Sequence, residues 1–346
     1  MRNIFYGAAT LALVCSNSVF ASENNHQHHA AHIATPAGIM GEHILSPGQF
    51  MTSYSYEQMN MSGYLKGSDD MTAEQVIASG YSQAADDMSM QMHMFGLMGG
   101  VTENITAMIM IPYVQKTMTH IDSHNARMKM KSEGLGDIEI SGITQIFSSD
   151  NLLSGHKINA NLSLGLSLPT GAIDESFTHV HGDGDAESHH MDYAMQLGSG
   201  TFDPTFAASL ADKFGRYSFG ARAEYTPRFS ENSENYRLGN EAKITTWTAA
   251  EVTDFMALSL RFDGKQIGNI NGIDKKISRS SMPGGRAELQ GGERIDGLVG
   301  VSIYKNVNSF GGHKLDLEYG IPLYQNLDGP QMKSENIMTL SYKLSF

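Results

Sequence analysis

Apolar and polar residues alternate with a period of two along most of the chain, in segments of roughly ten to fifteen residues. In 157–169, six apolar residues from Ile158 to Leu168 alternate with asparagine, serine and glycine. Residues i, i+2 and i+4 of a β-strand share a face, so each segment separates an apolar surface from a polar one. The segments 217–225 and 313–323 are divided in the same way. The pattern predicts an all-β protein.

Connections between the segments alternate in length. Twelve segments can be distinguished, near 48–64, 88–101, 105–120, 136–148, 157–169, 200–213, 216–228, 241–253, 255–267, 293–306, 313–324 and 335–346. Every second connection is short, and the longest of the others is 170–199. Long extracellular loops and short periplasmic turns are typical of a transmembrane antiparallel β-barrel. We therefore predict such a barrel of about 12 strands over 48–346, with both termini in the periplasm.

The last segment ends on an aromatic residue, Phe346, after Leu340, Tyr342 and Leu344 alternate with polar residues. This arrangement resembles the signal read by the barrel-insertion machinery, which is therefore an expected partner. A secreted β-sandwich with one solvated face is the alternative fold. A sandwich gives no reason to separate short from long connections or to end at an aromatic, so the barrel is favoured.

The N-terminus has the features of a secretory signal. Arg2 precedes an apolar stretch of about 11 residues, and small residues lead up to Ala21, whereas a spanning helix needs about 20 apolar residues. Residues 1–21 are predicted to be a signal peptide, and 22–47 a His-rich periplasmic segment outside the barrel wall. Whether that segment plugs the pore is left open. The expected location is the outer membrane of a Gram-negative bacterium.

Composition narrows the class of protein further. The 346 residues include one cysteine, Cys15, which excludes a disulfide scaffold and a cysteine zinc site. Lys+Arg number 24 against Asp+Glu 37, and the formal charge of -13 opposes nucleic-acid binding. The expected partner of the outer face is outer-membrane lipid. The residues predicted to face it are Leu162, Leu164, Leu166, Leu315, Leu317, Leu340, Tyr342 and Leu344.

Three stretches, 133–137, 164–171 and 193–203, resemble the outer-membrane transporter family labelled "putative MetA-pathway of phenol degradation". They read EGLGD, LGLSLPTG and YAMQLGSGTFD. The methionine-rich strands and the opening 38–43 resemble a Met/His-rich branch of that family. The resemblance implies a barrel that passes small, aromatic or hydrophobic solutes. The glycines of the three stretches fit tight turns and barrel corners.

Methionine is unusually frequent, with 22 residues. The register of alternation predicts that Met92, Met94, Met108 and Met110 point into the lumen, while Met59, Met61, Met118, Met128 and Met130 extend the group toward one sector of the barrel. Thioethers are ligands for copper. The alternative, which the pattern favours, is that methionine packs irregular space or forms an apolar lining.

Histidines gather in two stretches, the N-terminal segment and the longest loop. The candidate metal ligands are His26, His28, His29, His32, His179, His181, His189 and His190. Several neutral imidazoles in a short tract can reach one ion without a prebuilt core. The alternative is a solvated polar tract. Copper or another transition metal is the expected ion, and no cofactor is required.

Charged residues recur on the face opposite the apolar one. The predicted lining combines Met92, Met94, Met108 and Met110 with Glu139, Arg222, Glu224, Arg261, Asp316 and Glu318. A salt-bridge ladder that supports the wall is favoured over a selectivity lining, in which net acidity would prefer cations.

We therefore expect an outer-membrane channel for small solutes, aromatic or hydrophobic compounds or metal ions among them. The alternative is a non-transporting structural or metal-binding surface barrel. The sequence contains no GxSxG, HExxH or phosphate-binding loop, and most histidines lie outside the predicted strands. An enzyme is not expected.

Overall fold

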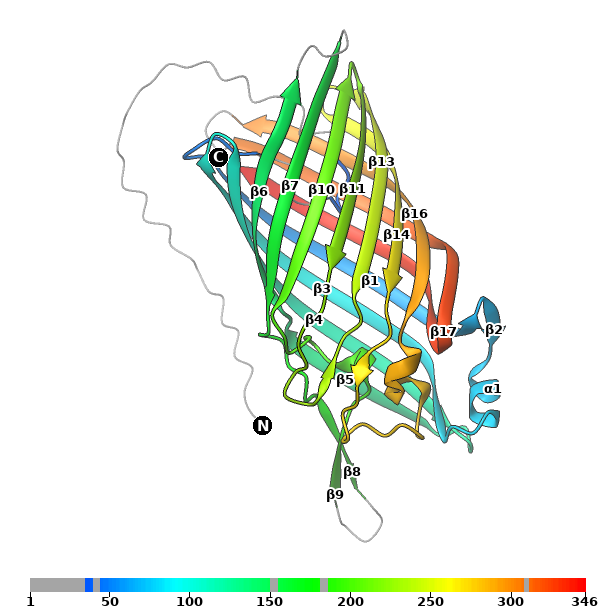
Figure 1. Ribbon diagram of the computed structural model, residues 1–346. Coiled ribbons are helices and arrows are strands. Elements are labelled where there is room, and N and C mark those ends of the chain that lie inside the picture. The colour runs from blue at the N-terminus through cyan, green and yellow to red at the C-terminus, as the bar shows by residue number, and fades with distance from the viewer. Residues whose placement is uncertain (1–34, 40–43, 150–154, 181–185, 308–310) are drawn as a thin grey trace, which may run out of the picture.

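The computed structural model describes residues 35–39, 44–149, 155–180, 186–307 and 311–346. The signal peptide and His26, His28, His29, His32 and His181 lie outside these ranges. The described chain forms an antiparallel β-barrel (Figure 1). Within the described ranges, no helix is long and apolar enough to cross a membrane.

Within the described ranges, eleven strand elements form the closed wall. They are β1 (Phe50–Gly67), β3 (Gln83–Thr102), β4 (Ile105–Asp122), β6 (Ile138–Ser149), β7 (His156–Leu168), β10 (Asp203–Phe214), β11 (Tyr217–Thr226), β13 (Glu241–Thr253), β14 (Met256–Ile267), β16 (Gly292–Val307) and β17 (Gly311–Ser345). The remaining elements are β2 (Asp69–Met71), α1 (Ala73–Ala78), β5 (Arg127–Leu135), β8 (Ser176–Val180), β9 (Ala186–His190), η2 (Tyr193–Met195), β12 (Tyr236–Arg237), β15 (Asn271–Gly272), η3 (Pro283–Gly285) and η4 (Ala287–Leu289).

The element β17 crosses the wall twice. Its residues 311–327 pair antiparallel with β16, whereas 327–345 pair antiparallel with β1. A closed barrel in which every pair of neighbouring strands is antiparallel needs an even number of strand crossings. Eleven elements can close such a barrel only because β17 reverses direction near Leu327 and so supplies two crossings. The described part of the chain therefore passes through the wall twelve times, and the predicted transmembrane barrel is confirmed.

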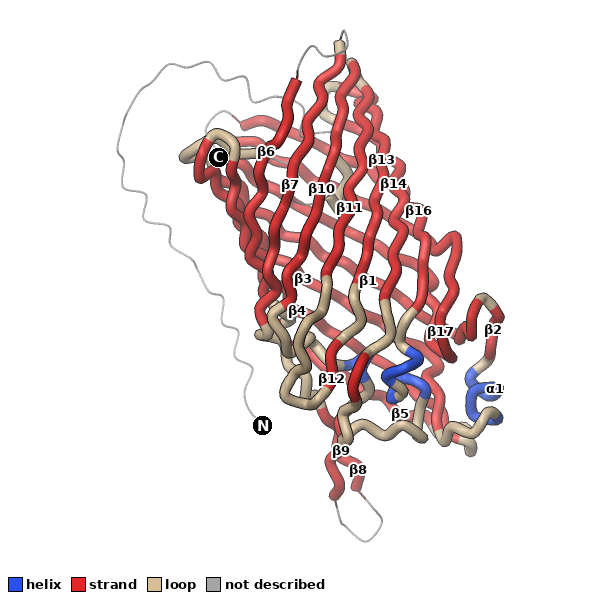
Figure 2. The backbone as a smooth tube through the Cα atoms, viewed as in Figure 1, coloured by secondary structure: helices blue, strands red, loops and turns tan. Residues whose placement is uncertain are grey.

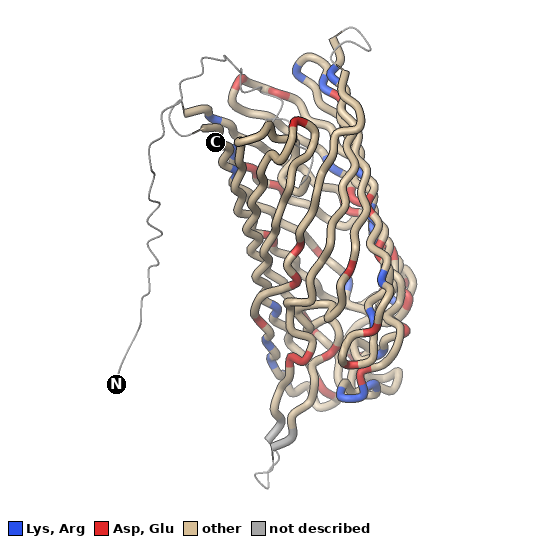
Figure 3. Tube along the Cα trace, turned by 60° about the vertical axis from the view of Figure 1, so that its left-hand side comes forward, with Lys and Arg blue, Asp and Glu red and all other residues tan. Residues whose placement is uncertain are grey.

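Short and long connections lie at opposite ends of the barrel (Figure 2). β3 and β4, β10 and β11, and β13 and β14 are joined by tight turns at the end where the C-terminus lies. Most of the remaining connections are long and carry α1, the 3-10 helices and the short strands at the other end. Figure 3 shows many acidic and basic positions gathered at this long-loop end.

The outer face of the wall is apolar. Leu164 is 58% exposed and Val299 is 60% exposed, values that suit a surface in contact with lipid rather than water. Of the eight residues predicted to face lipid, Leu162, Leu164, Leu315, Leu317, Leu340 and Tyr342 are exposed, and Leu166 and Leu344 are partly exposed. Their lumen-facing neighbours on the same strands, such as Asn161 and Ser341, are buried.

The long-loop end contains more strand than the sequence pattern indicated. Residues 127–135, expected in a loop, form β5, which pairs with 113–121 of β4 outside the main ring. β4 continues past its pairing with β6, which ends at Met110, so its outer part presents unpaired backbone groups. β5 satisfies them. The longest loop contains a further hairpin, β8–β9.

Candidate functional site: the barrel lumen

A cavity of about 290 Å³ occupies the middle of the lumen. One wall carries the thioethers of Met92 and Met94 from β3 and of Met108 and Met110 from β4. Alternation explains this placement, because Phe95 and Leu97 on the opposite face of β3 are exposed on the outside. The cavity is also lined by Ala37, Gly38, Ile39, Ser55, Glu57, Glu139, Arg222, Glu224, Lys243, Thr245 and Thr339.

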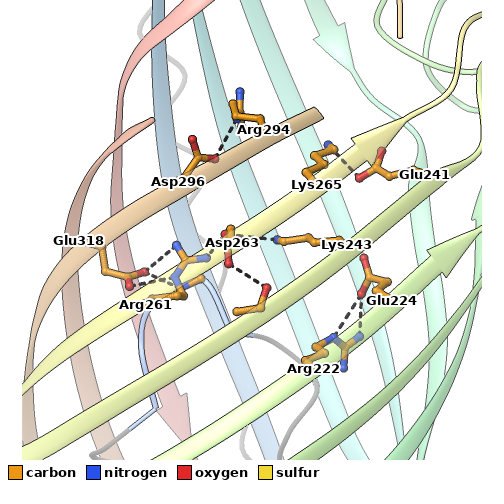
Figure 4. A network of polar contacts seen from close by, with 12 residues as sticks. Arg222, Glu224, Glu241, Lys243, Arg261, Asp263, Lys265, Arg294, Asp296 and Glu318 are labelled. Carbon is orange, nitrogen blue, oxygen red and sulfur yellow. Dashed lines mark hydrogen bonds and ion pairs between the residues drawn. The ribbon is translucent and has the colours of Figure 1, made fainter. Parts of the chain in front are cut away.

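The wall facing these methionines carries ion pairs (Figure 4). Arg222 on β11 binds Glu224 two residues along, at 2.9 Å between Nη2 and Oε2. Lys243 on β13 lies 3.7 Å from Asp263 of β14. Residues i and i+2 share the lumen face, so alternating charges on one strand can pair with each other and with the next strand. The predicted ladder of charges is thus present in the lumen.

The cavity lining combines three carboxylates, Glu57, Glu139 and Glu224, with two cations, Arg222 and Lys243. Its formal charge is therefore one net negative. Among the described residues, the Nη1 atom of Arg222 is buried without a hydrogen-bond partner. The guanidinium of Arg222 lines the cavity and carries five N–H donors, so it can donate to an oxygen atom of a solute there.

Residues 35–39 of the N-terminal segment lie inside the barrel. The Gly38 N–H donates to Glu318 Oε2 at 2.8 Å. The ammonium of Lys314 donates to the Thr35 carbonyl, and that of Lys343 donates to the Ile39 carbonyl at 3.4 Å. Because β17 ends at Ser345 and Lys343 is close to that end, these contacts lie in the short-turn half of the barrel. This part of the predicted periplasmic segment therefore narrows the lumen.

Three residues predicted to line the pore lie against this segment and not on the cavity. Arg261, Asp316 and Glu318 are 4%, 1% and 1% exposed. Arg261 Nε donates to Glu318 Oε1 at 3.1 Å and a second nitrogen pairs with Asp263. Asp316 lies 3.1 Å from the ammonium of Lys314. These charges are paired, as buried charges must be.

A buried cluster rich in methionine lies at the long-loop end. Met88, Met118, Met130, Met191 and Met195 are buried there beside Tyr64 and Val76, with Met61, Met71, Met128 and Met332 packed against them. Ser132 Oγ donates to the Met195 carbonyl at 2.7 Å, so η2 is held against β5. Methionine acts here as a packing residue. Met59 instead contacts Arg294 Nη1 at 3.6 Å in the lumen.

The three stretches that resemble the phenol-degradation family meet at one point of the rim. Asp137 Oδ1 accepts the Gly171 N–H at 2.9 Å, and its Oδ2 accepts the Ser199 N–H at 2.7 Å. A Cβ added to Gly198 would lie 2.6 Å from the Gly171 carbonyl oxygen. The motif glycines therefore permit close backbone contact between the loops after β5, β7 and η2, which is a structural role.

The described histidines of the longest loop lie on the two strands of the β8–β9 hairpin, His179 on β8 and His189 and His190 on β9. His179 belongs to β8, opposite Glu187 of β9 in the hairpin register, and nothing is described of its side chain. His190 Nδ1 lies 2.8 Å from Asp274 Oδ2, and the His189 ring is tilted against that of Phe177 with ring centroids 5.8 Å apart. His189, His190, Met128, Met130 and Asp192 border a smaller cavity of about 230 Å³. Burial raises the pKa of the Asp192 carboxyl to about 6, against the opposing charge of Lys116.

Residues 35–39, Glu57 and Lys243 belong to the site but were not predicted to do so. Glu57 lies two residues from both Ser55 and Met59, so the three side chains share the polar face of β1. Strand alternation could therefore have predicted that Glu57 points into the lumen. Lys243 lies in a strand whose inward face also includes the buried Trp247, which obscures the alternation. Nothing in the short, nearly apolar run 35–39 distinguishes a lumenal segment from a linker.

The fold is similar to that of an outer-membrane channel from Pseudomonas putida F1, with a TM-score of 0.59 and 12% identity, covering 87% of this chain and 97% of that chain. The transport unit of the autotransporter AIDA-I from Escherichia coli has a TM-score of 0.45 and 10% identity, covering 91% of this chain and 96% of that one. The CymD monoaromatic hydrocarbon channel has a TM-score of 0.39 and 9% identity, covering 87% of this chain and 89% of that one.

No protein-family model and no curated protein sequence matches the chain. At 12% identity, the likeness to the Pseudomonas channel shows a shared fold. The chain has the fold of an outer-membrane β-barrel channel. The family suggested by the three sequence stretches stays a prediction.

Proposed function

We propose that the protein is an outer-membrane channel for small aromatic or other hydrophobic solutes that carry a polar group. The observation that carries the proposal is the two-sided cavity, with four thioethers on one wall and an ion-pair ladder on the other. Sulfur atoms make favourable contacts with aromatic rings. The guanidinium of Arg222, which lines the cavity, would donate a hydrogen bond to the oxygen of a phenol-like solute.

Size and charge define the solute class further. An apolar cavity of about 150 Å³ can hold benzene, so about 290 Å³ is sufficient for a ring with substituents. The net negative lining disfavours anions. A neutral phenol should therefore pass more readily than a carboxylate such as benzoate. The resemblance to a phenol-degradation family supports the same solute class, and the outer-membrane channel fold supports an outer-membrane location.

The test is flux through the purified barrel in liposomes. We expect phenol to cross faster than through protein-free liposomes, and benzoate of similar size to cross more slowly than phenol. The matched variant changes Met92, Met94, Met108 and Met110 to leucine, which retains volume and hydrophobicity but deletes sulfur. Phenol flux equal to that of protein-free liposomes would contradict the proposal, and benzoate flux equal to phenol flux would contradict the assigned selectivity.

A metal-linked version of the channel rests on the same four thioethers. Copper prefers soft sulfur ligands, and the four side chains share one wall of the lumen. If they form a copper route, the four-leucine variant should lose copper flux into liposomes. Its phenol flux should fall by a smaller factor, because leucine keeps the wall apolar and only the sulfur–ring contacts are lost. Unchanged copper flux in that variant would mean that the methionines serve only as an apolar lining.

A further inference from the structure

Three ligand-bearing side chains meet in the extracellular loop layer, away from the lumen cavity. His190, Glu234 and Asp274 each offer one ligand atom, and these atoms lie within 4.8 Å of one another. His190 ends β9, Glu234 precedes β12 and Asp274 follows β15. The group therefore connects three loops that are far apart in the sequence.

This cluster is buried to an extent unusual for surface charges. The side chains of His190, Asp274 and Glu234 are 11%, 1% and 17% exposed. Asp274 Oδ2 lies 2.8 Å from His190 Nδ1, and its Oδ1 accepts the Lys276 N–H at 2.8 Å. An apolar cluster of Tyr193, Tyr236, Ile270, Ile277 and Ala287 lies beside the group and fixes the loops that carry it. The Asp274 N–H donates to the Tyr193 hydroxyl at 3.1 Å.

The chemistry of the donors selects a class of ion. One imidazole nitrogen and two carboxylate oxygens, with a remaining position for water, are a common ligand set for zinc and related divalent transition metals. Ligand atoms around zinc, with bonds of about 2.0–2.2 Å, lie about 3.3 Å from each other in a tetrahedron. The His190–Asp274 distance is already close to this value, and only the longer Glu234 side chain has to move in.

Glu234 is at present paired with a cation from the chain itself. The ammonium of Lys276 lies 2.9 Å from the Glu234 carboxylate, and the Lys276 side chain is 58% exposed. Two carboxylates against one lysine leave one net negative charge at the cluster when His190 is neutral. A divalent ion would compete with the ammonium for Glu234, and the exposed lysine can turn into solvent when displaced.

We propose that His190, Glu234 and Asp274 form a binding site for a divalent transition-metal ion of the zinc class, which clamps three extracellular loops together. The site differs from the thioether wall of the lumen, because it offers no sulfur and lies in the loop layer. It is independent of the solute that the channel passes.

The experiment measures Zn²⁺ binding by calorimetry to the full-length mature barrel in detergent, after chelator treatment. To remove competing imidazoles, His26, His28, His29 and His32 are changed to glutamine in every protein compared. We expect one saturable site that weakens at least about tenfold in H190Q, D274N and E234Q, since each removes a ligand. We expect K276M to bind Zn²⁺ more tightly, because it removes the competing ammonium.

The matched control is H156Q. His156 Nδ1 lies 2.7 Å from Asp212 Oδ2 in a second His–Asp pair, which belongs to no such three-residue group among the described residues. We expect its Zn²⁺ affinity to equal that of the parent. Absence of saturable binding in the parent, or equal affinity in the parent and H190Q, would overturn the proposal. If D274N fails to fold, E234Q and K276M still test the proposal, because the Glu234–Lys276 ion pair is partly exposed. A Zn²⁺ affinity equal to that of the parent in both variants would also overturn the proposal.

Discussion

Gly38 and Glu318 lie 280 residues apart in the sequence and form a hydrogen bond inside the barrel, at 2.8 Å from the glycine N–H to Oε2. The guanidinium of Arg261 lies so close that a Cβ added to Gly38 would be 2.5 Å from its Nη2. Arg261 is itself bound to Glu318 and Asp263. Glycine is therefore the residue that allows residues 35–39 to pass over this ion pair.

The first prediction is that G38L releases residues 35–39 from the lumen. A leucine side chain cannot fit against a guanidinium that two carboxylates hold in place, so the segment should leave the wall. The expected result is a larger single-channel conductance in planar bilayers. G142A is the control, since a Cβ at Gly142 meets nothing within 4 Å. Equal conductance of G38L and the parent would show that the segment does not limit the pore.

The second prediction concerns the lipid face. Leu164 is 58% exposed in the middle part of β7, and replacing it by arginine should destabilise the barrel by about 2–4 kcal/mol if it lies at mid-membrane depth. Urea unfolding in lipid vesicles measures the change. L164F keeps the position apolar and should unfold close to the parent. An L164R barrel as stable as L164F would show that this face does not contact the hydrocarbon.

The wall of the barrel could be predicted from the sequence because its physics is local and periodic. One strand face contacts lipid and the other the lumen, so a pattern such as that of 157–169 records both environments residue by residue. The connection lengths predicted that short turns lie at one end of the barrel and long loops at the other. Alternation of apolar and polar residues did not predict β5. Its residues 127–135 pair outside the membrane-facing wall and therefore do not need a strictly apolar face.

The site could be predicted only in part, because its remaining features depend on contacts between distant segments. The inward direction of Met92 and Met110 follows from strand alternation. The position of Gly38 depends on Arg261 and Glu318, more than 200 residues away, and no local pattern records such a pairing. The convergence of His190 with Asp274 likewise depends on how two long loops pack.

The third prediction concerns ion selectivity. R222Q removes one of two cations from a cavity lining that has three carboxylates, so its formal charge changes from one to two negative. The preference of the channel for cations over anions should increase, because a more negative lining attracts cations and repels anions. Reversal potentials in a KCl gradient measure the change, and R216Q, which alters an exposed arginine at a turn, is the control. A reversal potential equal to that of the parent would place the selectivity-determining region elsewhere in the lumen.

The last prediction tests the contact that unites the three sequence stretches. Asp137 accepts hydrogen bonds from the Gly171 and Ser199 N–H groups, at 2.9 and 2.7 Å, so D137A leaves both donors without their acceptor. Hydrogen bonds to a charged group contribute about 1.5–3 kcal/mol each, and because Asp137 is partly exposed we expect a local loss of about 2 kcal/mol. Hydrogen exchange at Gly171 and Ser199 should then accelerate, while the amides of the barrel wall stay protected. D254A, at a side chain that is 95% exposed, should leave exchange at both amides unchanged. Equal protection of these amides in D137A and the parent would mean that packing of Gly171 against Gly198 alone holds the rim.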